Sequence, residues 1–336
     1  MTKLRRALPS KQVLREAVEL AARAPSIHNT QPWRWRITGD TVDLFADRSR
    51  RLRIVDPRCR ALRVSCGAAL FQLRIALAAE GWRTSVTRLP NPFNDDHLAA
   101  VLITGSMPVT VEHQRLRAAA ERRRTDRRPF AAQTVDAAAI QALIAAAASE
   151  GAHLHRIVRD EDRLVLAVAV GRADEIEAAD PSYLAEIRAW SGRPVGATEG
   201  VPAASVPHLP DRQPEVVMRD WELAAPGTLQ APAPTQSERA DLLVLATTGD
   251  SALDQVRAGE ALERVLLTAT GLGLSASPYT QPLEVPGPCS LMHRVVGPGQ
   301  RPQIALRVGR PGPGTEPPLT PRRPLTEILE EPETAR

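Results

Sequence analysis

The chain has 336 residues, which is enough for one large hydrophobic core or for two linked ones. Its formal net charge of +4 at pH 7 is mild, and lysine occurs only at Lys3 and Lys11. A solvated basic surface accounts for this charge as well as an anionic partner does, so charge alone gives no argument for nucleic acid. The three cysteines Cys59, Cys66 and Cys289 form no Cys-x-x-Cys pair, which fits a reducing compartment and a structural role.

Targeting and membrane signals are weak in this sequence. No apolar run approaches the roughly 18 residues that a membrane span needs, and the N-terminus lacks the apolar core of a signal peptide. We therefore expect a soluble, cytoplasmic protein without a membrane partner.

The first predicted elements enclose a polar turn. Apolar residues recur at helical spacing over 13–21, and Pro25 cannot continue that helix because it has no N–H. Apolar and basic residues then alternate over 33–37, which predicts a half-buried strand. Between them lie polar side chains on non-helical backbone: Ser26, His28, Asn29 and Gln31. The amides can read the pyrimidine edge of a flavin, which offers alternating acceptors and a donor. The alternative is a turn whose amides satisfy their own backbone.

Two long predicted helices indicate an internal duplication. Residues 66–81 align without a gap on residues 258–273, and the alignment matches Gly67 with Gly259 and Gly81 with Gly273. Each helix is expected to begin near its first glycine and to end at its second, which can adopt the left-handed cap conformation. A short strand follows each helix. The alternative is two unrelated alanine-rich helices that align by composition.

Shorter segments repeat in the same order along the chain. The predicted helix near 13–24 pairs with one near 137–148, and the strand at 33–37 pairs with 153–157. Residues 99–104 likewise resemble 303–308. Elements that alternate helix with strand give a layered α/β or α+β sheet.

An arginine string lies between the repeats. Arg122, Arg123, Arg124, Arg127 and Arg128 are followed by Pro129-Phe130. Two arginines at i and i+4 around a helix end can bind one phosphate, because the guanidinium fork matches phosphate oxygens. The alternative is a solvated basic helix end. A nucleic-acid site is disfavoured because no aromatic residue is interleaved with the arginines.

A long segment interrupts the second repeat. Residues 191–236 are rich in proline and glycine and show no sustained period, although 214–223 can form a short helix and Trp190 and Trp221 can anchor its edges. A loop of this length inside a compact domain is usually a lid or a linker. A linker at a domain boundary is awkward here, because both flanks belong to the same repeat.

Four of these segments together resemble one family. They are Pro-Ser-x-His-Asn-x-Gln-Pro-Trp at 25–33, Arg-Arg-Thr-Asp-Arg-Arg-Pro-Phe at 123–130, Ala-Gly-Glu-Ala-Leu-Glu-Arg-Val-Leu-Leu-Thr-Ala-Thr at 258–270, and Pro-Arg-Arg-Pro-Leu at 321–325. The chain resembles the nitroreductase superfamily, and within it the Acg-type, dormancy-associated flavoproteins of mycobacteria and their actinobacterial relatives.

The resemblance implies the fold and the domain organisation. It implies an α+β, nitroreductase-like, three-layer α/β/α fold in which two fused halves, 1–112 and 113–336, form an internal pseudo-dimer with a lid-like insertion at about 191–236. Members of this family are homodimers that bind FMN between subunits, so a fused pair is expected to act as a monomer. The polar turn lies in the first half and the arginine string in the second. We therefore expect one FMN per chain.

The resemblance also implies which residues contact FMN. The arginine string follows the pattern Arg-x-Ser-x-Lys/Arg-x-Phe, with Asp126 where serine is usual and Thr125 as the alternative hydroxyl. Residues 279–281 replace a Glu-Gly-like turn near flavin N5. The implied contacts are Pro25, Ser26, His28, Asn29 and Gln31 at the flavin edge; Arg124, Asp126, Arg128, Arg322 and Arg323 at the phosphate; and Thr280 and Gln281 near N5. For Arg322 and Arg323 the alternative is a basic tail flanked by prolines.

Two functions remain open at this point. The first is an FMN-dependent oxidoreductase that passes electrons from NAD(P)H to a nitroaromatic or quinone-type acceptor. It needs no protein nucleophile and no metal, and the chain has no Gly-x-Ser-x-Gly elbow and no His/Cys cluster at metal spacing. The second is a protein that stores or sequesters FMN under a closed lid with little turnover.

Overall fold

The computed structural model describes residues 8–194, 196–207, 227–229, 239–314 and 316–330. The segment 214–223, predicted as a short helix, and Trp221 lie outside the described residues.

The first repeat forms a helix, two strands, a long central helix and two further strands. Its elements are α1 (Lys11–Ala21), β1 (Trp33–Thr38), β2 (Thr41–Ala46), α2 (Arg60–Ala79), β3 (Trp82–Arg88) and β4 (His97–Ser106), with short 3-10 helices at Ile27–Asn29 and Arg48–Arg50. The four strands are ordered β1-β2-β4-β3. Pairing within this set is antiparallel throughout.

The second repeat has the same succession and the same strand order. Its elements are α4 (Ala137–Ser149), β5 (His153–Arg156), β8 (Asp241–Thr247), α7 (Ala252–Gly271), β9 (Ser275–Tyr279) and β10 (Arg301–Gly309), and the sheet is ordered β5-β8-β10-β9. Each paired segment of the predicted duplication therefore occupies the equivalent place in its sheet. Two unrelated helices of similar composition do not explain this agreement.

The remaining elements connect or cover the two repeats. They are α3 (Val111–Arg122), α5 (Asp160–Ala178), α6 (Pro181–Trp190), β6 (Ser191–Arg193), β7 (Val201–Pro202), α8 (Gln281–Glu284), α9 (Pro286–Val296), α10 (Leu325–Ile328) and β11 (Leu329–Glu330), with a 3-10 helix at Ala203–Ser205. The predicted unstructured insertion thus begins with β6 at the end of α6.

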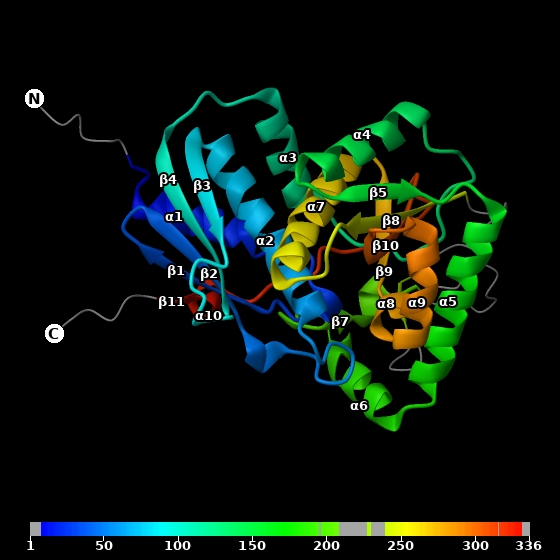
Figure 1. The fold of residues 1–336 in the computed structure, drawn as a ribbon. Helices are drawn as coiled ribbons and strands as arrows, with labels where there is room; N and C mark the ends of the chain where they lie inside the picture. Colours follow the sequence, from blue (N-terminus) through cyan, green and yellow to red (C-terminus); the bar gives the residue numbers. More distant parts are fainter. Residues whose placement is uncertain (1–7, 195, 208–226, 230–238, 315, 331–336) are drawn as a thin grey trace, which may run out of the picture.

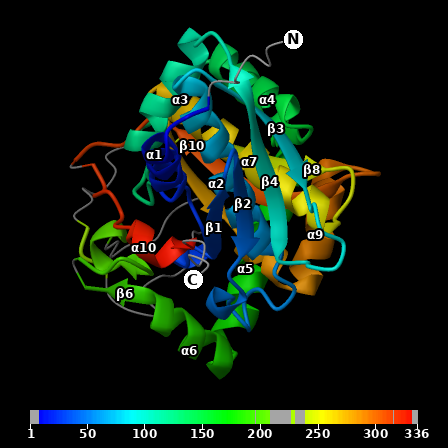
Figure 2. The same cartoon turned by 90° about the vertical axis from the view of Figure 1, so that its left-hand side faces the viewer.

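The helices α2 and α7 lie at the centre, between the two sheets (Figure 1). The second half has three layers, because α4 and α7 pack on one face of its sheet and α5 and α9 on the other. In the first half α1 and α2 cover one face of the sheet. Seen from the side of the first half, β2 and β4 lie in front of α2 and α7 (Figure 2). The outer face of this sheet carries half-exposed side chains such as Arg34 and Arg36.

Two glycines set the closeness of the central helices. A Cβ added to Gly67 would lie 2.9 Å from Cα of Gly259, and one added to Gly259 would lie 2.8 Å from Cα of Gly67. These glycines were predicted near the helix starts, and the structure instead places both inside their helices. The reason is packing rather than capping, since only residues without a Cβ let the two backbones approach so closely. The predicted end glycines do adopt the left-handed conformation, with φ of 81° at Gly81 and 72° at Gly273.

The chain beyond residue 112 contributes to both sheets. Residue Thr125, beyond α3, forms a parallel bridge with Ala276 of β9 in the second half. At the C-terminus β11 returns to the first sheet, where Leu329 pairs with Trp35 of β1. The first sheet therefore contains chain from both sides of residue 112, and the division at residue 112 stays a prediction.

Among the described residues, one helix is long and apolar enough, by length and composition alone, to cross a membrane. The apolar stretch of α2 has a mean hydropathy of 1.4, but 78% of it is buried inside the fold. The sequence was expected to hold no such stretch. The helix is apolar all round because it is covered by the first sheet, α1 and α7, which makes it a core helix.

Candidate functional site

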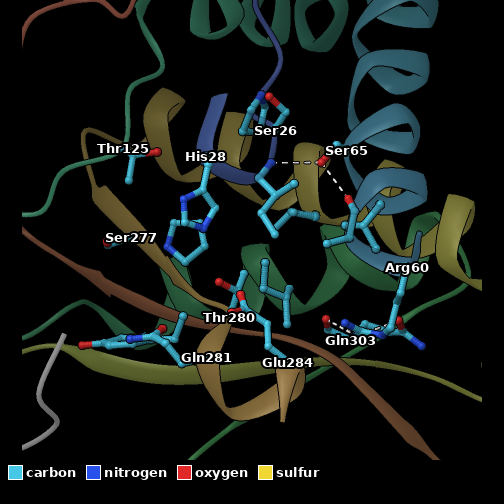
Figure 3. A pocket seen from close by; sticks show the side chains of 18 of the residues that line it. Ser26, His28, Arg60, Ser65, Thr125, Ser277, Thr280, Gln281, Glu284 and Gln303 are labelled. Atoms are coloured by element: carbon cyan, nitrogen blue, oxygen red, sulfur yellow. Dashed lines mark hydrogen bonds between the residues drawn. The ribbon is translucent and has the colours of Figure 1, made fainter. Parts of the chain in front are cut away.

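A cavity lies where the two halves meet (Figure 3). Its apolar wall comes from both central helices and from β10, through Val64, Leu262 and Ile304. Polar side chains project into it from five separate segments. Besides this wall, the lining includes Pro25, Ser26, His28, Arg60, Ser65, Thr125, Arg127, Ser277, Thr280, Gln281, Glu284 and Gln303.

The polar turn of the first half forms one lip of this cavity. Pro25, Ser26 and His28 line it, as predicted for an edge loop, and His28 points into it (Figure 3). The backbone here is strained, because His28 has a φ of 46° and Asn29 a φ of 54°. Ser26 Oγ accepts a hydrogen bond from the backbone N–H of Gln31, at 2.9 Å. This bond holds the lip in its tight turn.

The two amide side chains of the lip have other partners. Asn29 Nδ2 donates to the carbonyl oxygen of Gly200 at 3.0 Å, and Gln31 Nε2 donates to that of Thr198 at 2.7 Å. Gln31 Oε1 accepts the backbone N–H of Arg323 at 2.8 Å, and Gln31 is fully buried. The amides thus bind the insertion and the C-terminal segment on the side away from the cavity. Their contact with FMN stays a prediction.

The arginine string also reaches the cavity. It was expected around a helix end, but α3 ends at Arg122 and the chain beyond it is largely extended. Alternate residues of an extended segment face opposite sides. Thr125 and Arg127 consequently line the cavity, and Arg127 Nη1 donates to the carbonyl oxygen of Ser205 at 3.3 Å.

The residues predicted to grip the phosphate lie on the other side of this segment. Arg128 and Asp126 are both 2% exposed and form an ion pair at 2.8 Å, which Ser275 supports by donating to Asp126. Arg124 instead pairs with Glu316 at 2.8 Å. Arg124 and Arg128 thus pair with different carboxylates, and a single phosphate held by both stays a prediction. Asp126, where serine is usual, serves as the buried partner of Arg128.

The segment predicted to pass flavin N5 also reaches the cavity. Ser277 in β9 and Thr280 and Gln281 at the start of α8 all line it. Gln281 is 2% exposed, and its Nε2 lies 3.5 Å from Asp174 of α5. This segment therefore lies opposite the His28 lip (Figure 3).

The two C-terminal arginines form hydrogen bonds within the protein. Arg322 donates to the carbonyl oxygens of Ala22 and Arg23 beyond α1, both at 3.1 Å. Arg323 donates through Nε to Glu327 at 3.1 Å. Arginine bound to carbonyls at a helix C-terminus compensates the negative end of the helix dipole. Neither side chain lines the cavity, and their phosphate role stays a prediction.

The N-terminus of α2 brings charge to the far end of the cavity. Arg60 Nη2 donates to Gln303 Oε1 at 3.0 Å and to the carbonyl oxygen of Pro302 at 3.1 Å. Burial lowers the pKa of Arg60, an effect that Asp250 opposes. Asp56 caps the helix by accepting the N–H of Leu62 at 2.8 Å, and burial raises the pKa of this carboxyl to about 6.

Neither a reactive thiol nor a metal centre is found here. Cys66 is fully buried, donates to the carbonyl oxygen of Pro32 at 3.1 Å, and has a pKa that burial raises strongly. Such a thiol is inert. Within the described ranges, no cluster of His, Cys, Asp or Glu side chains is able to hold a metal ion.

Ion pairs occupy the region of the other repeat that corresponds to the cavity. Glu150, in the turn after α4 that corresponds to the polar lip, lies 2.7 Å from Arg74 and 2.9 Å from Arg264. Glu260 of α7 is fully buried and lies 2.7 Å from Arg74 and 2.6 Å from Arg88 at the end of β3. Charges in this region are therefore compensated within the chain.

Several lining residues were missed by sequence reasoning. Thr125 was considered only as an alternative hydroxyl, and Arg127 was left out because the family pattern selects Arg124 and Arg128. An extended reading of 123–130 finds both. Arg60, Ser65, Glu284 and Gln303 carry no local signal, because their place in the cavity depends on how α2, α8 and β10 pack.

Comparison with known proteins gives related mycobacterial chains. The chain is 40% identical over 328 residues to "Putative NAD(P)H nitroreductase Rv3131" of Mycobacterium tuberculosis, covering 97% of this chain and 93% of that one. It is 36% identical over 319 residues to "Putative NAD(P)H nitroreductase acg" of the same species, covering 94% and 95%. No family model matches the chain.

Solved structures give a more distant likeness. A nitroreductase with bound FMN from Desulfitobacterium hafniense aligns at 13% identity with a TM-score of 0.40, covering 65% of this chain and 98% of that one. A BluB-like flavoprotein from Clostridium difficile aligns at 15% identity with the same TM-score, covering 63% and 96%. The sequence relatives carry the assignment: this chain belongs to the nitroreductase family.

Proposed function

We propose that the chain binds one FMN in the cavity between its halves and uses it to reduce nitroaromatic or quinone-type acceptors with NAD(P)H. The observation that carries the proposal is the composition of the cavity wall. Apolar side chains from α2, α7 and β10 suit the plane of an isoalloxazine ring, while polar groups surround it at the rim. When bound, FMN supplies the hydride chemistry, and the protein supplies binding and orientation.

Different residues facing the cavity would bind different parts of FMN. Thr125 and Arg127 offer a hydroxyl and a guanidinium, the groups that bind a phosphate of nearly two negative charges. Ser26 and His28 offer polar contacts to the flavin edge, and Thr280 and Gln281 lie on the opposite side. No protein nucleophile takes part, so we assign no catalytic residue of that kind.

A single FMN per chain is supported by the contrast between the two ends of the central helices. The cavity lies at one of them, whereas the Glu150–Arg74–Glu260–Arg88 ion pairs occupy the corresponding region of the other repeat. A second flavin there would have to displace buried, paired charges, which is costly.

Storage of FMN is the alternative function, and one observation favours it. Thr198 and Gly200 of the insertion bind the lip through the amides of Gln31 and Asn29. If the insertion also closes over the cavity, as a lid would, nicotinamide and acceptor are excluded. Stopped-flow reduction of the bound flavin by NADPH within seconds would refute storage, while reduction by dithionite alone would refute the reductase.

The phosphate assignment has its own test. Arg127→Met is expected to weaken FMN binding at least tenfold and to leave riboflavin binding unchanged, because only FMN carries the phosphate. Arg122→Met is the matched control, since Arg122 is exposed at the end of α3 and its loss changes the net charge equally. Equal FMN affinity in Arg127→Met and the unchanged protein would contradict the assignment.

A further inference from the structure

The guanidinium of Arg60 stands apart among the groups that line the cavity. It lies at the end remote from Thr125 and across the cavity from His28 (Figure 3). About a fifth of its side chain is exposed, on the side of the cavity. A flavin phosphate bound at Thr125 and Arg127 therefore leaves Arg60 available to a second ligand.

The position of Arg60 is fixed by neutral acceptors. Nη2 donates to Gln303 Oε1 and to the carbonyl oxygens of Pro302 and Gln303. Gln303 is itself held, because its Nε2 donates to Thr247 Oγ1 at 2.8 Å and to Asp250 at 3.1 Å. The guanidinium is thus preorganised by a buried network that does not neutralise it.

The charge of Arg60 is only partly compensated. Its nearest carboxylate oxygen belongs to Asp250, at 3.7 Å from Nε, and that side chain is 50% exposed. Glu284 lines the same cavity from α8. Across the part of the chain that the structure describes, Nη1 of Arg60 makes no hydrogen bond to protein. A half-buried guanidinium with an unused donor is a site for an anionic or oxygen-rich group.

We propose that Arg60 is a specificity-determining residue, which binds the carboxylate or nitro group of an aromatic electron acceptor lying in the cavity. Both groups present two coplanar oxygens on an sp2 centre, the geometry that a guanidinium recognises. With the isoalloxazine ring against the apolar wall, the flavin itself would offer an aromatic face for the ring of the acceptor. The inference rests on the proposed function, since it places the acceptor beside the bound flavin.

Benzoate and benzamide have similar shapes, but only benzoate is charged. Comparing their affinities therefore tests whether the cavity recognises the charge. Each is titrated into the FMN-loaded protein, and binding is followed by the change in flavin absorbance. The unchanged protein is expected to bind benzoate at least tenfold more tightly than benzamide, as a charge-assisted hydrogen bond provides. Arg60→Met is expected to abolish this preference. Arg58→Met, which removes an exposed arginine two residues away, is the matched control and should retain it.

Arg60→Lys provides a second variant in case the methionine variant folds poorly. It keeps the charge and loses the planar fork, so an intermediate preference for benzoate is expected. A preference that persists in both Arg60 variants, or that is absent from the unchanged protein, would overturn the inference. Weaker FMN binding in Arg60→Met with unchanged riboflavin binding would also overturn it, because Arg60 would then hold the flavin phosphate.

Failure of the proposed function gives a different result. If the unchanged protein binds no FMN, the proposed function is refuted, and the same two ligands are titrated into the flavin-free protein by calorimetry. Benzoate preference that depends on Arg60 would then still support anion recognition by this residue. Equal binding of benzoate and benzamide would refute that as well.

Discussion

The crossing of α2 and α7 offers the sharpest test of how the two halves are joined. In Gly67→Ala the new methyl would lie 2.9 Å from Cα of Gly259 and closer still to the carbonyl oxygen of Val256, whereas real Cβ contacts essentially never fall below 3.0 Å. Both obstacles are backbone atoms, so no rotamer change relieves the clash. The helices must instead move apart, and with them the core on either side.

The magnitude follows from two opposing terms. Overpacking of a closely packed core costs about 1–3 kcal/mol, and the rigid backbone obstacle places this case at the upper end. Alanine in a helix interior recovers roughly 0.5–1 kcal/mol relative to glycine. The expected net loss is about 2 kcal/mol, which lowers Tm by roughly 3 °C in a chain of 336 residues.

Thermal unfolding followed by far-ultraviolet circular dichroism measures this loss, and the chain contains a matched control. Gly171 lies inside α5, and a Cβ added there meets no atom within 4 Å. Gly171→Ala should therefore raise stability by about 0.5–1 kcal/mol through helix propensity alone. If Gly67→Ala were as stable as the unchanged protein or more so, close helix contact would not explain the glycine pair.

Three further predictions follow from buried polar groups. The folded-state pKa of Asp56, about 6, lies above its unfolded value, so the stability contributed by this group is greatest at low pH and falls by at most about 3 kcal/mol as pH rises from about 4 to 6. Urea midpoints measured between pH 4 and 8 should lose this pH dependence in Asp56→Asn. The same pH dependence of the midpoint in Asp56→Asn and the unchanged protein would contradict the prediction. Gln31→Met leaves the carbonyl of Thr198 and the N–H of Arg323 without this partner, so a loss of about 1–3 kcal/mol is expected in chemical denaturation, and an unchanged midpoint would speak against the clamp. Arg88→Met removes one of two cations from buried Glu260 and should cost up to about 3 kcal/mol, part of which Glu260→Gln restores in the double variant; a single variant as stable as the unchanged protein would contradict this.

Much of the fold could be predicted from local patterns in the sequence. Pro25 predicts the end of α1, alternation predicts β1, and Gly81 and Gly273 predict the left-handed ends of the central helices. The duplication could also be recognised from the sequence, because the two central helices align without a gap although insertions separate the other repeated segments. These features depend on neighbours within a few residues, which is why a single sequence reveals them.

The site depended more on tertiary structure. The sequence identified Ser26, His28, Thr280 and Gln281 as candidate contacts, and all of them line the cavity. It could not say that the chain after α3 is extended, which turns Thr125 and Arg127 inward and leaves Arg128 paired with Asp126. Extended and helical backbone place neighbouring side chains on different faces, so the register of a motif is undecided until its backbone is known.

What the sequence by itself determined is the family, the repeat and the polar turn at 25–31. Only the tertiary structure decided where the turn's amides point, because their partners Thr198, Gly200 and Arg323 come from segments more than 160 residues away. Arg60 shows the same limit, since its role depends on Gln303, which lies on a strand of the other half. Hydrogen-bond partners so distant along the chain are set by the packing of whole helices and sheets, which local sequence does not encode.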